Sequence, residues 1–113
     1  MRIEVLWWEG CPSLPDTLAL LDGALAELGG PAVELEVREI RGEDEAEREG
    51  FVGSPTVRIE GADVDPAVDP AVDPARAWPG GSRLNCRIYR LADGRFSPTP
   101  DPGVLRAALI AQL

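Results

Sequence analysis

Residues 3–28 constrain the fold most, because an apolar run leads directly into an amphipathic pattern. Residues 3–8 are apolar at nearly every position, which predicts a central strand covered on both faces. The run breaks at Gly10, and apolar residues then recur at spacings of four and three, the stripe of an amphipathic helix. These residues are Leu14, Leu18, Leu21, Leu25 and Leu28. Cys11 is therefore expected in the turn between a first strand and a first helix.

The position of Cys11 suggests a reactive thiol. Free backbone N–H groups and the positive end of a helix dipole stabilise a thiolate at such a turn, and turns at strand ends are usually exposed. Ser13 fits the N-cap of the helix, although a helix that begins at Pro12 would place Cys11 itself at the N-cap. The alternative is that Cys11 is a small buried residue in a tight turn.

The rest of the chain continues as alternating strands and helices. Alternating apolar residues predict strands at 33–38 and 84–91, and a β-branched run opened by Pro55 predicts one at 56–59. An acidic helix is expected at 43–49, and a last helix with Asp101 as N-cap follows Pro100. The order β-α-β-α-β-β-α predicts one α/β domain over residues 1–113, which is the size of a single core.

Residues 62–83 differ from the rest of the chain. The tetrad Val-Asp-Pro-Ala occurs three times between Val64 and Ala75, and each Asp-Pro pair opposes a continuous helix. We expect an acidic, extended insertion loop between the third and fourth strands, with few core positions.

Composition narrows the classes of function. The chain carries 11 basic and 20 acidic residues, a net charge of −9, which disfavours nucleic acid and anionic membranes as partners. Every basic residue is arginine and histidine is absent, so acid–base chemistry falls to carboxylates, thiols or water. No cofactor and no metal site are expected. The chain enters its first strand at once and has no apolar run of membrane-spanning length, so we expect a cytoplasmic protein with reduced cysteines.

The element order, the cysteine after the first strand and the proline that opens the third strand together resemble the thioredoxin-like fold. More narrowly, three motifs resemble a group of small bacterial thioredoxin-like proteins, some of which are labelled alkylmercury lyase. The motifs are Gly-Cys-Pro at 10–12, Gly-Ser-Pro-Thr at 53–56 and Cys-Arg-x-Tyr at 86–89. The resemblance covers the whole chain except the insertion.

The resemblance implies a role for each matching residue. Cys11 would be the nucleophilic thiol of a protein resembling a thiol–disulfide oxidoreductase, and Pro55 would be a cis-proline packed against it. Trp8 would belong to the aromatic approach to the site. The backbone of Ser54 or Thr56 would pair with an extended substrate segment.

Two departures from the family pattern bear on activity. Leu14 stands where the family's second, resolving cysteine lies, and Val5 stands where a buried carboxylate is often found. The chain cannot form a local Cys-x-x-Cys disulfide. Cys86 is the other cysteine, and as the start of a fourth strand it is expected near the opposite edge of the sheet, in the core with Leu84 and Ile88.

Three functions follow from these features. The first is a thioredoxin-like protein with one active thiol, in which Cys11 forms mixed disulfides with a protein or small-molecule partner or captures electrophiles. The second is a non-catalytic adaptor that binds a protein through exposed tryptophans and the acidic loop. The third is soft-metal or organomercurial chemistry by Cys11 with Cys86, which requires the two sulfurs to meet.

Overall fold

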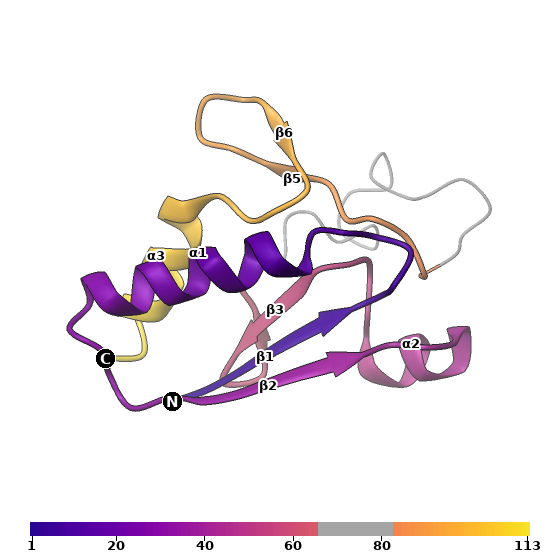
Figure 1. The fold of residues 1–113 in the computed structure, drawn as a ribbon, viewed down its shortest axis with the longest axis horizontal. Coiled ribbons are helices and arrows are strands. Elements are labelled where there is room, and N and C mark those ends of the chain that lie inside the picture. The colour runs from indigo at the N-terminus through magenta and orange to yellow at the C-terminus, as the bar shows by residue number, and fades with distance from the viewer. Residues whose placement is uncertain (66–82) are drawn as a thin grey trace.

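A four-stranded mixed sheet with strand order β2-β1-β3-β4 organises the domain (Figure 1). The computed structural model describes residues 1–65 and 83–113. The strands of this sheet are β1 (Arg2–Trp7), β2 (Glu34–Glu39), β3 (Thr56–Ile59) and β4 (Ala62–Asp63). The helices are α1 (Leu14–Glu27), α2 (Glu43–Glu49) and α3 (Pro102–Ile110). The predicted α/β class and its order of elements are confirmed.

β1 is the central strand, as its apolar sequence predicts. It pairs in parallel with β2, with Ile3 opposite Leu35, and antiparallel with β3, with Ile3 opposite Ile59. The side chains of Ile3, Val5 and Leu6 are fully buried, which gives β1 apolar contacts on both faces.

The helices cover the two faces of the sheet unequally. α1 and α3 lie together against one face, where Leu21, Leu105 and Leu109 pack on the sheet residues Ile3 and Val57 (Figure 1). α2 covers part of the opposite face, at the carboxyl end of β1. That second cluster consists of Leu6, Ile40, Ala46 and Phe51.

The carboxyl-terminal part of the chain begins with a short hairpin and ends in α3. β5 (Tyr89–Arg90) pairs antiparallel with β6 (Phe96–Ser97), and this hairpin stands away from the main sheet (Figure 1). Asp101 is the N-cap of α3, as predicted, and its side chain accepts hydrogen bonds from the backbone N–H groups of Gly103 and Val104.

The fourth strand lies elsewhere than the sequence pattern predicts. β4 follows β3 through a tight turn at residues 60–61, and Val64, just after it, is buried in the main core. Residues 62–63 therefore belong to the sheet and Val64 belongs to the core, rather than to an insertion of few core positions. Of the strand expected at 84–91, only Tyr89–Arg90 forms a strand, and it pairs with β6 rather than with the main sheet; residues 84–88 form one isolated bridge. The Val-Asp-Pro-Ala tetrads lie largely outside the described residues.

Within residues 1–65 and 83–113, no helix is both long and apolar enough to cross a membrane.

Candidate thiol site

Cys11 lies in the turn between β1 and α1, as the sequence predicts. The helix begins at Leu14 with Ser13 at the N-cap position, so Cys11 precedes the cap by two residues. The Ser13 side chain makes no capping bond; its Oγ lies 3.3 Å from the Cys11 Sγ instead. The backbone N–H of Cys11 donates to the carbonyl oxygen of Trp8 at 3.1 Å, which closes the turn.

The loop before β3 meets this turn. The peptide bond between Ser54 and Pro55 is cis, as predicted. The Cys11 thiol donates to the carbonyl oxygen of Ser54 at 3.6 Å, and the backbone N–H of Trp8 donates to the Ser54 Oγ at 3.0 Å. Two segments more than forty residues apart in sequence are thereby joined around one sulfur.

A third segment covers this junction. The N–H of Ser54 donates to the carbonyl of Asn85, and the N–H of Arg87 donates to the carbonyl of Ser54, both at 2.8 Å. Ser54 and Cys86 thus form a parallel bridge. We call residues 85–87 the covering segment. The free backbone edge expected at Ser54 is therefore taken by the chain itself.

Gly53 allows the covering segment to approach closely. A Cβ at this position would lie 2.6 Å from the Asn85 Oδ1 and 2.9 Å from the Arg87 Cβ, too close for any side chain. The backbone of Gly53 also has a φ of +139°, in the region that favours glycine. The Gly-Ser-Pro-Thr motif therefore supports contact with residues 85–87 as well as contact with Cys11.

Thr56 is integrated into the sheet. It is the first residue of β3, pairs with Leu6 of β1, and donates from its Oγ1 to the carbonyl of Gly53 at 2.7 Å. Its side chain steadies the loop that carries Ser54 and Pro55.

Cys86 lies beside Cys11, which corrects the expectation that it occupies the opposite edge of the sheet. Its Sγ is 4.0 Å from the carbonyl oxygen of Gly10, the residue before Cys11. Burial, a hydrogen bond with the Cys11 side chain and the charge of Cys11 together raise the pKa of Cys86 to about 11. The expectation failed because residues 85–87 run alongside Ser54 instead of forming the fourth strand.

The exposure of the two cysteines is also the reverse of what the sequence suggests. Cys11 is only 3 % exposed, whereas Cys86 is partly exposed. The alternation of Leu84, Cys86 and Ile88 pointed to a core face, yet Ile88 is 44 % exposed. The buried side chains of this stretch are the intervening ones, Asn85, Arg87 and Tyr89.

Arg87 fixes the covering segment to β4. Its guanidinium makes a two-point ion pair with the Asp63 carboxylate at 2.8 and 3.1 Å, and donates to the carbonyl of Asp65 at 2.8 Å. It also stacks on the ring of Tyr89, 4.7 Å from the ring centre. The sequence alone predicted no role for Arg87, although its place in the Cys-Arg-x-Tyr motif was a sign that it has one.

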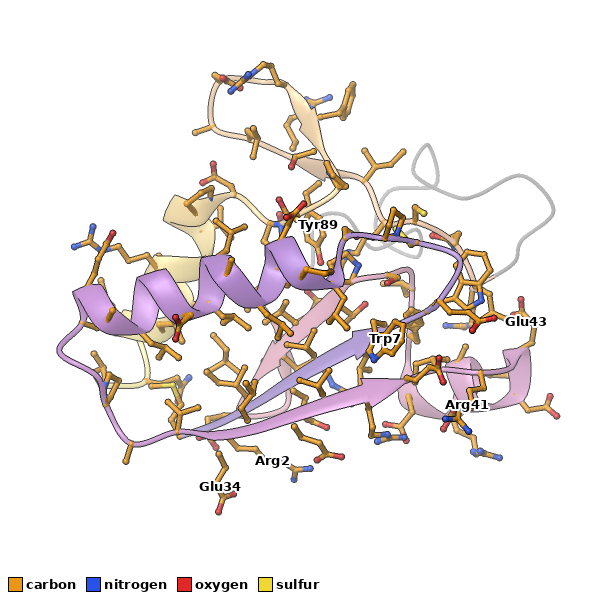
Figure 2. The ribbon with its side chains drawn as sticks, in the orientation of Figure 1. Arg2, Trp7, Glu34, Arg41, Glu43 and Tyr89 are labelled. Carbon is orange, nitrogen blue, oxygen red and sulfur yellow. The ribbon has the colours of Figure 1, made fainter. Side chains whose placement is uncertain are left out.

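Tyr89 ties the same stretch to the proline loop. Its hydroxyl donates to the carbonyl oxygen of Pro55. The side chain points from β5 toward the body of the domain and is fully buried (Figure 2). Burial, partly opposed by the Arg87 charge, raises the pKa of the Tyr89 phenol. Arg87 and Tyr89 thus tie this stretch to β4 and to the proline loop.

Trp8 borders the turn on its outer side. Its indole ring lies against the backbone of Gly10, where an added Cβ would meet ring carbons at 2.2–2.5 Å. Beyond the ring is a surface hollow of about 360 Å³. The hollow is lined by Trp8, Glu9, Glu39, Ile40 and Arg41.

The arrangement offers sulfur chemistry. In the described part of the chain, no cluster of three or more cysteine or carboxylate side chains is placed to hold a metal ion. Both cysteines are free thiols. Comparison of the chain with protein-family models, with curated proteins and with solved structures finds no match.

Proposed function

We propose that this chain is a thioredoxin-like thiol protein that uses Cys11 for thiol–disulfide exchange with a protein or small-molecule disulfide, or for capture of an electrophile. The observation that carries the proposal is the meeting of the β1–α1 turn, the Ser54 carbonyl and a second thiol around the Cys11 sulfur. The strand order β2-β1-β3-β4 is compatible with the thioredoxin-like resemblance of the three motifs.

The exchange step is a displacement at sulfur. The Cys11 thiolate attacks one sulfur of the partner's disulfide, a new S–S bond forms, and the other sulfur leaves as a thiolate that takes a proton from water. Ser13 Oγ, at 3.3 Å, is placed to donate a hydrogen bond to the anionic sulfur. The amino end of α1 adds a favourable dipole.

Access to Cys11 requires local movement. The sulfur is covered, so a substrate segment that pairs with Ser54 has to displace residues 85–87. Gly10 and Pro12 on either side of Cys11 are exposed, so the turn itself lies at the surface. We assign substrate contact to Trp8 of this turn and to Ser54, Pro55 and Thr56 of the proline loop, which meets the turn through Ser54.

Specific observations favour the two other candidates. The 3 % exposure of Cys11 favours a non-catalytic adaptor, in which the thiol is a core residue. The nearness of Cys86 favours binding of a soft ion between two thiolates. Each makes a different prediction for the reactivity of the native thiols.

The test uses glutathione disulfide as the probe. The native protein is expected to release reduced glutathione, and the Cys11→Ser variant is expected to release little. An Ile88→Ser variant is the matched control, because it changes an exposed side chain near the covering segment. Release from the wild type only in denaturant would reject exchange in favour of the adaptor. Protection of both thiols from alkylation by one equivalent of Ag⁺, without glutathione release, would favour the metal function.

A further inference from the structure

The two cysteines are held together by reciprocal contacts. The Cys11 sulfur contacts the carbonyl of Ser54, the residue that bridges to Cys86. The Cys86 sulfur in turn contacts the carbonyl of Gly10, the residue before Cys11. Each thiol therefore lies against the backbone that positions the other.

Hydrogen bonds, close packing and an ion pair maintain this proximity. The covering segment is paired with Ser54 through two backbone hydrogen bonds, lies directly against Gly53, and is anchored to Asp63 by Arg87. The Arg87 side chain is only 2 % exposed, so its ion pair is well shielded from solvent on the arginine side. Cys86 is thus presented to Cys11 by a segment that is held at the Gly53–Ser54 loop and at Asp63.

We propose that Cys86 is the resolving thiol of Cys11, so that the chain cycles between a dithiol and an internal Cys11–Cys86 disulfide. This inference rests on the proposed exchange function and extends it to a second residue. It assigns to the covering segment the role that the family pattern gives to a cysteine at the position of Leu14.

The two steps balance in atoms and electrons. In the first, Cys11 attacks a disulfide RSSR and forms the mixed disulfide Cys11–S–S–R with release of one RSH. In the second, the Cys86 thiolate attacks the Cys11 sulfur, forms the Cys11–Cys86 bond and expels the second RSH. The two protein thiols lose two electrons and two protons in total, and the partner disulfide is reduced to two thiols.

Electrostatics favours reaction of Cys11 before reaction of Cys86. In the dithiol, the hydrogen bond with Cys11 and its charge add to burial in raising the pKa of Cys86. Formation of the mixed disulfide removes the charge and the ionisable proton of Cys11. The contribution of that charge to the raised pKa disappears, so Cys86 loses its proton more readily after Cys11 has reacted than before.

The experiment counts glutathione released from glutathione disulfide by the full-length protein and maps the products by non-reducing mass spectrometry. Wild type is expected to release two equivalents and to give a peptide that joins Cys11 to Cys86. Cys86→Ser is expected to release one equivalent and to retain glutathione on Cys11. Ile88→Ser is expected to match wild type.

A second pair of variants tests the role of the covering segment. Gly53→Ala forces residues 85–87 away, whereas Gly61→Ala also places an alanine at a positive φ, +82°, but with no atom within 4 Å of the added Cβ. In Gly53→Ala alone, the rate at which the internal disulfide closes is expected to fall by about tenfold to a hundredfold. Small displacements of reacting groups have effects of this size. Circular dichroism checks that both variants fold.

The outcomes separate the two proposals. No glutathione release from the native wild type would reject the exchange function. One equivalent released, with glutathione retained on Cys11 in the presence of Cys86, would leave exchange intact and overturn the resolving role. Equal closure rates in Gly53→Ala and Gly61→Ala would overturn the role of the covering segment.

Discussion

At the scale of single residues, Cys86 and Tyr89 are weak acids that stay protonated to a higher pH in the folded protein than in the unfolded chain. Burial is the main reason for both raised pKa values, with the Cys11 side chain adding to it at Cys86. Both residues lie beside the proline loop, Cys86 through its bridge to Ser54 and Tyr89 through its bond to Pro55. Ionisation of either one places a negative charge at the thiol site.

We predict that the protein loses stability as the pH rises above about 9. The folded state holds the Cys86 proton up to a pKa of about 11, whereas the unfolded chain releases it near 9, so folding is favoured below 9 and this contribution is lost between 9 and 11. Tyr89 adds a loss that begins near its ordinary value of 10. The measurement is the free energy of urea unfolding across this pH range.

The variant Cys86→Ser provides the comparison for this effect. It retains the size of the side chain, and its hydroxyl does not ionise in this range. Its free energy of unfolding should fall less steeply than that of wild type between pH 9 and 11. Parallel curves for the two proteins would show that ionisation of Cys86 does not contribute to alkaline instability.

At the scale of elements, a single arginine joins the covering segment to the main sheet. Asp63 lies on β4 and Arg87 lies on the covering segment, so their ion pair connects these two stretches. Opening of the covering segment over Cys11 requires this ion pair to break or to move with the segment.

Arg87→Met is predicted to destabilise the fold and expose Cys11. Loss of the arginine from this ion pair costs about 3 kcal/mol, because the partly buried Asp63 carboxylate loses its charged partner. The pair between Arg106 and Glu27 is more than half exposed on both sides, so Arg106→Met should change stability by less than about 0.5 kcal/mol. Urea unfolding and the alkylation rate of Cys11 measure the two effects. An alkylation rate in Arg87→Met equal to that in Arg106→Met would contradict the anchoring role.

The elements that the sequence predicted are those with a local cause. The apolar run of β1, the leucine stripe of α1 and the Asp101 cap of α3 are each specified by neighbouring residues. β4 has only two residues, Ala62 and Asp63, and therefore no pattern to detect. The alternation at 84–88 favoured burial of Leu84 and Ile88, but the ion pair of Arg87 and the hydrogen bond of Tyr89 turned the opposite face inward.

The same distinction applies to the thiol site. The position of Cys11 at the β1–α1 turn and the cis bond before Pro55 were predicted, because one depends on local pattern and the other on resemblance. The burial of Cys11 and the approach of Cys86 depend on the path of residues 85–87 over Gly53. That path is determined by contacts between segments about thirty residues apart in the sequence. The spacing of apolar residues within one segment carries no information about such contacts.

At the scale of the whole molecule, the domain is a sheet with helices on both faces, and the thiol site lies at the carboxyl end of its central strand (Figure 1). The two termini lie at the other end of the domain. Three stretches far apart in the sequence converge on the site: the turn after β1, the loop before β3 and the covering segment.

The long sequence separation of the two cysteines has a consequence for heat resistance. A bond between Cys11 and Cys86 would close a ring of about 75 residues, and chain-entropy arguments give such a ring about 4.5 kcal/mol of stabilisation against unfolding. The disulfide form is therefore expected to melt on the order of 10 °C or more above the dithiol form. Calorimetry of the two forms, with Cys86→Ser as the form that cannot close, measures the difference. A thermal midpoint independent of oxidation would show that the bond strains the native fold as much as it restricts the unfolded chain. If the difference is found, the redox state of the surroundings would set how long this protein survives heat.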